Sequence, residues 1–220
     1  MQHLWVTHQG SGYTQTDCDF VCEALAARSS RESLAKVWKD AVGQRKMLDL
    51  PELFKALKEW PLLLDVSPQF YFFILVRHRL LQESVDDYDA ATYVARLMVR
   101  RLKMVAQDPL RNLCGGHTCA ADYAELIATS SPRMKFFIEV AAGNQFLMLS
   151  SFYPDFLTKN YEMGIDFYRN FTRQAYQNAG RNRSAPNSHV RDFYSRLSEQ
   201  MPRVTLALDR VRELDLFLGE

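Results

Sequence analysis

The chain contains few residues that interrupt helices, with only 9 glycines and 8 prolines among 220 residues. It also has no uninterrupted apolar run of about 18 residues, the length that a membrane-spanning helix needs. Its polar first twelve residues lack the charged start and apolar stretch of a secretory signal. We therefore expect no membrane span, a cytoplasmic location and four reduced cysteines.

A marked charge excess is absent as well, because 27 basic and 26 acidic residues give a net charge of +1. Proteins that bind nucleic acid through its phosphates usually carry a clear basic excess. Nucleic acid is therefore not an expected partner, unless a local basic patch exists. Two clusters are candidates, although nearby aspartates favour a solvated mixed-charge surface: Arg96, Arg100, Arg101 and Lys103, and then Arg169, Arg173, Arg181 and Arg183.

Several catalytic and cofactor motifs are missing. The chain has no GxGxxG, no P-loop and no GxSxG, so nucleotide binding and α/β-hydrolase chemistry lack support. It also has no Glu-x-x-His pairs, which a di-iron helical bundle needs.

The remaining pattern is helical. Ser67-Pro68 and Ser131-Pro132 each join an N-cap serine to a proline at the first helical position. Apolar residues between such signals recur at helical spacing, and no alternation typical of strands occurs. We predict one all-α domain over 1–220, a compact bundle of about nine to ten helices around a central apolar helix at 132–152.

The other expected helices follow from the same pattern. The expected ranges are 17–28, 34–41 with Gly43 as its C-cap, a short helix around 53–57, 68–82, 88–105, 119–128, 155–178, 188–200 and 202–218. Residues 1–15 are expected to be loosely ordered and 180–187 to form a mobile loop. Ala141, Ala142 and Gly143 suggest close approach of another backbone, and Met163-Gly164 a close helix crossing.

Two segments carry a resemblance. Phe70–Leu97 reads FYFFILVRHRLLQESVDDYDAATYVARL, and Gly143–Tyr168 reads GNQFLMLSSFYPDFLTKNYEMGIDFY. Together they resemble an uncharacterised family of bacterial helical proteins with YVLVR…DYVA and GD..LF.SGFFP…MG…Y segments. The resemblance implies a helical fold over about residues 50–180 and no particular activity. Asn144 stands where the family has an acidic residue.

Polar residues within the apolar helices suggest a pocket. An arginine and a histidine at the end of a buried helix can bind an anion, and a buried carboxylate such as Glu139 can act as an acid or base of raised pKa. Tyrosines at helical spacing can line a cavity. Structural roles are the favoured alternative, including an ion pair of Glu139 with Arg77 or Arg96. The candidate pocket residues are Arg77, His78, Tyr93, Glu139, Asn144, Tyr161 and Tyr168.

Cys114, His117 and Cys119 form the most metal-like string, and Cys18 with Cys22 could complete a zinc site. The spacing is unusual for zinc, so ordinary buried thiols are favoured.

Three hypotheses remain. The leading one is a non-catalytic binding or protein-interaction module that forms a homo-oligomer through an exposed apolar or aromatic face. The alternatives are an enzyme or cofactor-binding protein that uses the candidate pocket for a small molecule, and a zinc-stabilised regulator.

Overall fold

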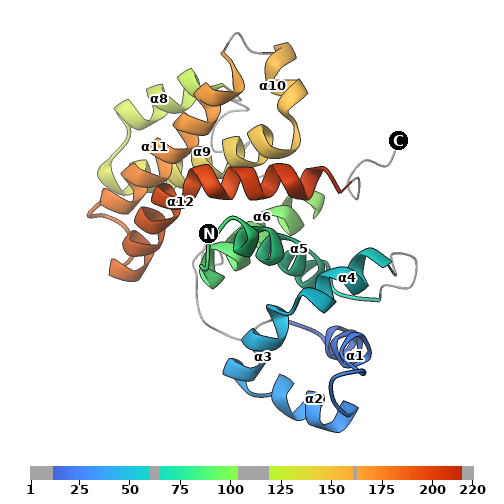
Figure 1. The fold of residues 1–220 in the computed structure, drawn as a ribbon. Helices are drawn as coiled ribbons and strands as arrows, with labels where there is room; N and C mark the ends of the chain where they lie inside the picture. Colours follow the sequence, from blue (N-terminus) through green and yellow to red (C-terminus); the bar gives the residue numbers. More distant parts are fainter. Residues whose placement is uncertain (1–11, 60–64, 104–118, 161–162, 215–220) are drawn as a thin grey trace.

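A computed structural model describes residues 12–59, 65–103, 119–160 and 163–214 (Figure 1). These residues form eleven helices and no strand, which confirms the all-α prediction. No described helix combines the length and apolar character needed to cross a membrane. The helices are α1 (Gln15–Ala24), α2 (Arg31–Trp38), α3 (Ala41–Leu48), α4 (Pro51–Glu59), α5 (Pro68–Gln82), α6 (Tyr88–Lys103), α8 (Ala120–Thr129), α9 (Pro132–Phe152), α10 (Pro154–Asn160), α11 (Ile165–Arg181) and α12 (Ser188–Arg212).

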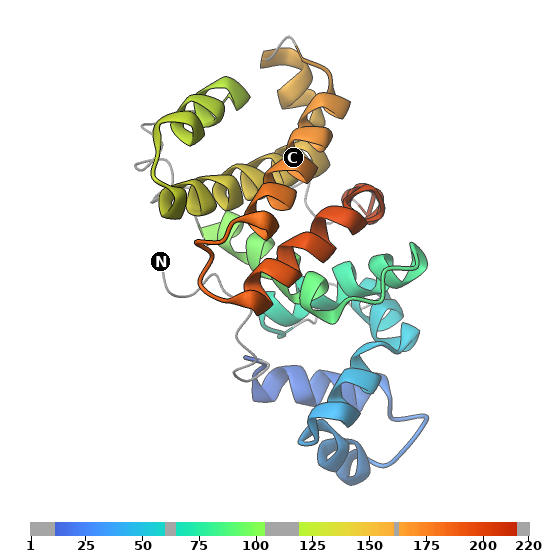
Figure 2. The same cartoon turned by 90° about the vertical axis from the view of Figure 1, so that its left-hand side faces the viewer.

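The helices form two connected groups (Figures 1 and 2). Helices α1 to α4 lie at one end of the molecule, where α4 packs on α5 and α1 packs on α2 and α4. At the other end, α8, α10 and α11 pack around α9. Helices α5, α6 and α12 pack together between these groups, so that one large hydrophobic core is continuous from α1 to α12.

Helices α5 and α9 begin where the serine–proline pairs predict. The Ser67 hydroxyl accepts the backbone N–H of Phe70 at 3.2 Å, and the Ser131 hydroxyl accepts that of Met134 at 3.5 Å. These bonds satisfy backbone donors that the first turn of a helix leaves free.

The central position of α9 is confirmed, because fourteen of its 21 residues are buried. Helix α5 is a second buried helix, with eight of its 15 residues inaccessible to solvent. The close approach predicted at Gly143 involves a side chain rather than a backbone. A Cβ at Gly143 would lie 2.6 Å from the Tyr176 ring, so the glycine leaves room for this ring of α11.

Asp17 connects α1 to the start of α5. Its buried carboxylate accepts the backbone N–H of Thr14, and also the backbone N–H and hydroxyl of Ser67 at 2.7 and 2.8 Å. One side chain therefore satisfies polar groups at two helix starts, Gln15 and Pro68, that are 53 residues apart.

Gly43 does not end a helix as predicted. It lies in the first turn of α3, where its backbone N–H donates to Asp40 at 2.7 Å. Asp40 acts as an N-cap, so the chain ends α2 at Trp38 and starts a new helix three residues later. Helix α3 was not predicted, because a glycine at this position is typical of a helix C-terminus.

The single helix predicted over 155–178 is two helices, α10 and α11. Gly164 is the N-cap of α11, and a Cβ there would meet no atom within 4 Å. Met163 beside it is exposed. The predicted close crossing at Met163-Gly164 is therefore wrong, because the glycine begins a helix in open space.

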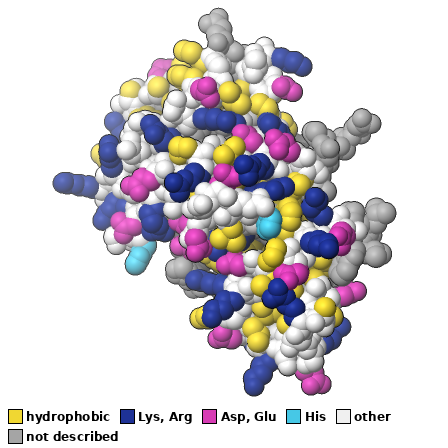
Figure 3. Space-filling view, in the orientation of Figure 1, with side chains coloured by type: hydrophobic (Ala, Val, Ile, Leu, Met, Phe, Trp, Pro, Cys, Tyr) yellow, Lys and Arg dark blue, Asp and Glu magenta, His cyan; other side chains and the backbone are white. Residues whose placement is uncertain are grey.

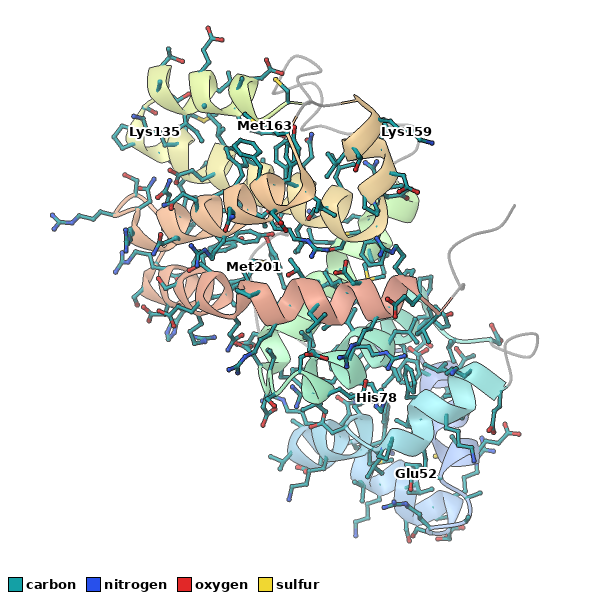
Figure 4. The ribbon with its side chains drawn as sticks, turned by 45° about the horizontal axis from the view of Figure 1, so that its top comes forward. Glu52, His78, Lys135, Lys159, Met163 and Met201 are labelled. Carbon is teal, nitrogen blue, oxygen red and sulfur yellow. The ribbon has the colours of Figure 1, made fainter. Side chains whose placement is uncertain are left out.

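Pro202 does not separate two helices as predicted, because α12 continues through it from Ser188 to Arg212. The helix changes direction near Met201, which Figure 4 labels. A proline inside a helix removes one backbone hydrogen bond and bends the axis. Buried Met201 and Val204 on either side pack into the core and hold both halves of α12.

The connection predicted to be mobile begins later than expected, because α11 continues to Arg181. The side chain of Asn182 donates to the carbonyl oxygen of Pro132 at 3.0 Å and accepts the backbone N–H of Ser184 at 2.9 Å. Ala185 is buried. These contacts fix the α11–α12 connection against the start of α9. The loose order predicted for residues 1–15 falls mainly on residues outside the described ranges.

Candidate functional site

Two of the predicted pocket residues, Tyr93 and Asn144, meet at the centre of the molecule. Tyr93 on α6 and Tyr176 on α11 both donate to Oδ1 of Asn144 on α9, the latter at 2.8 Å. The hydroxyl of Tyr194 on α12 lies 3.2 Å from that of Tyr93. All four side chains are buried. We call this set of residues the tyrosine–asparagine cluster.

The direction of these hydrogen bonds is fixed by the groups present. Because the Tyr93 proton is used toward Asn144, Tyr194 donates to Tyr93. Burial raises the pKa of Tyr93 to about 12 and raises the pKa of Tyr176 and Tyr194 as well. The three phenols therefore stay protonated at neutral pH, and their protons are shared within the cluster. The cluster joins four helices, and each of its three phenol protons is used within it.

Arg77 and His78 lie on α5, away from this cluster. Arg77 is buried and makes a two-pronged contact with Asp49, with Nε and Nη2 at 2.7 and 2.8 Å from the carboxylate oxygens. Its Nη2 also donates to Asp86 at 2.6 Å. Both hydrogen bonds raise the pKa of Arg77, while burial opposes them. Asp49 and Asp86 thus use Nε and Nη2 of the guanidinium that was expected to bind an anion, while its buried Nη1 has no hydrogen-bond partner among the described residues.

His78 stacks on Phe54 of α4, with ring centroids 3.9 Å apart. Burial lowers the pKa of His78, and the neighbouring charge of Arg79 lowers it further. The imidazole is therefore mainly neutral near pH 7 and packs as a ring between α4 and α5 (Figure 4).

Glu139 lies in α9, about two turns after the start of the helix at Pro132. Its side chain is 6% exposed. Burial raises its pKa from 4.5 to about 7, while Asn182 and Lys135 lower it by less. Its Oε2 has no hydrogen-bond partner. The predicted ion pair with Arg77 or Arg96 is not formed, because the α9 face that carries Glu139 meets the end of α11 instead.

Tyr168 belongs to a smaller second core formed by α8, α9, α10 and α11. Its ring stacks on Phe146 with centroids 5.1 Å apart. Tyr161 lies outside the described residues. The six described candidate residues therefore fall into four separate places, and a hydrogen bond joins Tyr93 to Asn144.

Among the described residues, the predicted zinc ligands lie in two places far apart. Cys18 and Cys22 are buried in α1, whereas Cys119 precedes α8 at the opposite end of the molecule (Figure 1). Burial and the neighbouring Cys22 thiol raise the pKa of Cys18 to about 11. Within the described ranges no three potential ligands converge. Cys114 and His117 lie outside those ranges.

An exposed apolar or aromatic face was predicted from the sequence, but the residues that form it were not. Of the eight large hydrophobic side chains exposed among the described residues, four lie between residues 153 and 167. Figure 3 shows hydrophobic side chains among charged ones at this end of the molecule. We name them the aromatic corner: Tyr153, Phe156, Met163 and Phe167, which are 39% to 53% exposed.

The aromatic corner is anchored in the second core. Phe167 packs on Tyr168 and Phe171, and Phe171 packs edge-on to buried Phe146. The guanidinium of Arg101 lies 5.6 Å from the centre of the Tyr153 ring. An exposed aromatic surface beside a packed core is suited to binding another protein.

Comparisons with protein-family models, with curated proteins and with solved structures find no match to this chain. The family resemblance of the two segments stays a prediction.

Proposed function

We propose that this protein is a non-catalytic interaction module that pairs with a second copy of itself through the aromatic corner. The observation that carries the proposal is the concentration of exposed large hydrophobic side chains between Tyr153 and Phe167. Apolar patches of this kind, rimmed by polar residues, commonly mark sites of protein association.

The charges around the aromatic corner support a second copy as the occupant. Asp155 and Lys159 are exposed on α10, and Asp166 is exposed at the start of α11. A two-fold contact brings the same patch of two copies together, so a patch that carries both signs can pair with itself. A patch of one sign would repel its copy.

The test is sedimentation velocity on the whole chain across a range of concentrations. We expect a dimer with a dissociation constant in roughly the micromolar range. Met163→Glu with Phe167→Glu should yield monomers. The matched control is Val37→Glu with Val42→Glu, which changes two exposed hydrophobics of α2 and α3 and should leave the dimer intact. Circular dichroism confirms that each variant is folded. A wild-type chain that stays monomeric, or two double variants that dimerise equally, contradicts the proposal.

A further inference from the structure

The segment 167–191 has an unusual charge. Its 25 residues contain five arginines and no lysine, aspartate or glutamate. The rest of the chain has 22 basic residues against 26 acidic ones. The near-neutral total therefore hides a basic segment inside an otherwise acidic chain. This segment forms most of α11, the connection to α12 and the first residues of α12.

Four of these arginines have no carboxylate partner among the residues that the structure describes. Arg169 is paired with Asp209 of α12, at 2.6 Å. No ion pair or hydrogen bond of the described residues uses the side chain of Arg173, Arg181, Arg183 or Arg191. All except Arg191 are exposed, and Arg191 is half-buried. Their charges are therefore available to a partner.

The packing brings these arginines together. A Cβ at Gly180 would lie 2.7 Å from the backbone nitrogen of Ser195 and 3.1 Å from the carbonyl oxygen of Arg191. Only a residue without a side chain allows the end of α11 to lie this close to the start of α12. Arg181 and Arg191 consequently emerge at the same end of the helical hairpin.

A fifth cation joins from α9. The bond from Asn182 to the carbonyl oxygen of Pro132 places exposed Arg133 beside Arg181 and Arg183. The arginine tip is defined here as Arg133, Arg181, Arg183 and Arg191. Figure 3 shows Lys and Arg side chains, with some Asp and Glu side chains among them, on the side where, in Figure 1, α11 ends and α12 begins. The positive ends of α9 and α12 add to the potential there, and the negative end of α11 opposes them in part.

We propose that the arginine tip and Arg173 bind the phosphate backbone of a nucleic acid. Arginine contacts phosphate through paired hydrogen bonds, and this segment uses arginine alone. Exposed amides accompany it along α11, with Asn170 and Gln174 among them, and such side chains contribute to both phosphate and base contacts. A membrane surface is disfavoured, because α11 and its connection to α12 expose no large hydrophobic side chain after Phe167. The inference is independent of the proposed dimer.

The test is fluorescence anisotropy with labelled single-stranded RNA and duplex DNA of about 20 nucleotides. We expect dissociation constants in roughly the micromolar range at low salt, with log K falling against log salt at a slope of about −3 to −4. Arg181→Gln with Arg183→Gln should weaken binding about tenfold or more and reduce the slope by about two. Arg28→Gln with Arg31→Gln removes the same charge from the other end of the molecule, where both arginines are ion-paired, and should have little effect.

Three outcomes would overturn the proposal. The first is equal binding by the two double variants, which would show that the affinity depends on the net charge of the protein and not on the position of the arginines. The second is competition by polyglutamate as effective as that by unlabelled RNA, which would indicate an acidic protein partner. The third is no binding of either probe at low salt while vesicles of anionic lipid bind.

Discussion

Tyr93 of α6 and Asn144 of α9 share a hydrogen bond in the water-excluded centre of the molecule. Asn144 sits in α9, a largely buried apolar helix, where an unpaired amide would be costly. Its oxygen accepts from both Tyr93 and Tyr176, so the asparagine fixes how α6 and α11 lie on α9. A polar group that is satisfied in one arrangement only favours that arrangement over other apolar packings.

Asn144→Leu should destabilise the protein by about 2–4 kcal/mol, because it leaves two buried hydroxyl groups without their acceptor. Chemical denaturation with circular dichroism measures this change. Adding Tyr93→Phe and Tyr176→Phe should recover part of the lost stability, since one buried hydroxyl, that of Tyr194, then lacks a partner instead of two.

The control is Tyr71→Phe, which removes a half-buried hydroxyl of α5 outside the cluster and should change stability by less than about 1 kcal/mol. If the triple variant is less stable than Asn144→Leu alone, the hydrogen bonds are not what the single substitution disrupts.

The best predicted helices are those with strong local signals. The starts of α5 and α9 at Pro68 and Pro132 follow from serine N-caps and a proline whose missing N–H is not needed there. Their long apolar sequences also identify them as the buried helices. Local chemistry decides these features, so the sequence alone is sufficient.

The predicted helix ends were wrong where tertiary contacts or a competing N-cap determine them. Pro202 is a standard helix breaker, yet the core contacts of Met201 and Val204 carry α12 through it. Gly43 is a common terminator, yet the Asp40 side chain uses its N–H to begin α3. Neither outcome can be read from propensity, because each depends on packing or on a competing cap.

The candidate site was predicted only in part. Tyr93 and Asn144 were chosen for their polar groups on apolar helices, and they do meet. Tyr176 and Tyr194 were missed as their partners, because contacts between residues 32 to 101 positions apart depend on helix packing. Arg181 and Arg183 of the arginine tip belong to a basic cluster that the sequence already indicates, whereas Arg133 joins them only through the packing of α9 against the α11–α12 connection.

Glu139 makes stability depend on pH. Its pKa is raised from 4.5 to about 7 in the folded chain, so its ionisation opposes folding. The protein therefore loses stability as pH rises from about 4.5 to about 7 and stays at the lower level above that. Glu139→Gln, which carries no charge at any pH, should be more stable than wild type by about 1–2 kcal/mol near pH 8.

The measurement is denaturant unfolding of both proteins between about pH 4 and pH 8. The difference between them should shrink steadily toward the acid end, where the wild-type carboxyl is protonated in both states. Glu125 on α8 is exposed and gives the matched control, because Glu125→Gln removes a charge that water already solvates. A constant difference between Glu139→Gln and wild type across this range would show that the carboxylate does not oppose folding.

Gly180→Ala tests the contact that assembles the arginine tip. Alanine gains about 1 kcal/mol over glycine from helix propensity alone, which favours the variant. Against this, the new Cβ would lie 2.7 Å from the backbone nitrogen of Ser195, and backbone cannot move aside as a flexible side chain can. Overpacking of this kind commonly costs about 1–3 kcal/mol, so we expect net destabilisation and weaker binding of RNA and DNA by a folded variant.

Gly164→Ala is the matched control, since a Cβ at this N-cap meets nothing within 4 Å and should cost at most about 1 kcal/mol. Thermal unfolding and anisotropy on both variants separate the steric effect from the general cost of replacing glycine. If Gly180→Ala were as stable as wild type and bound both probes with unchanged affinity, the close contact between α11 and α12 would not be what brings Arg181 and Arg191 together.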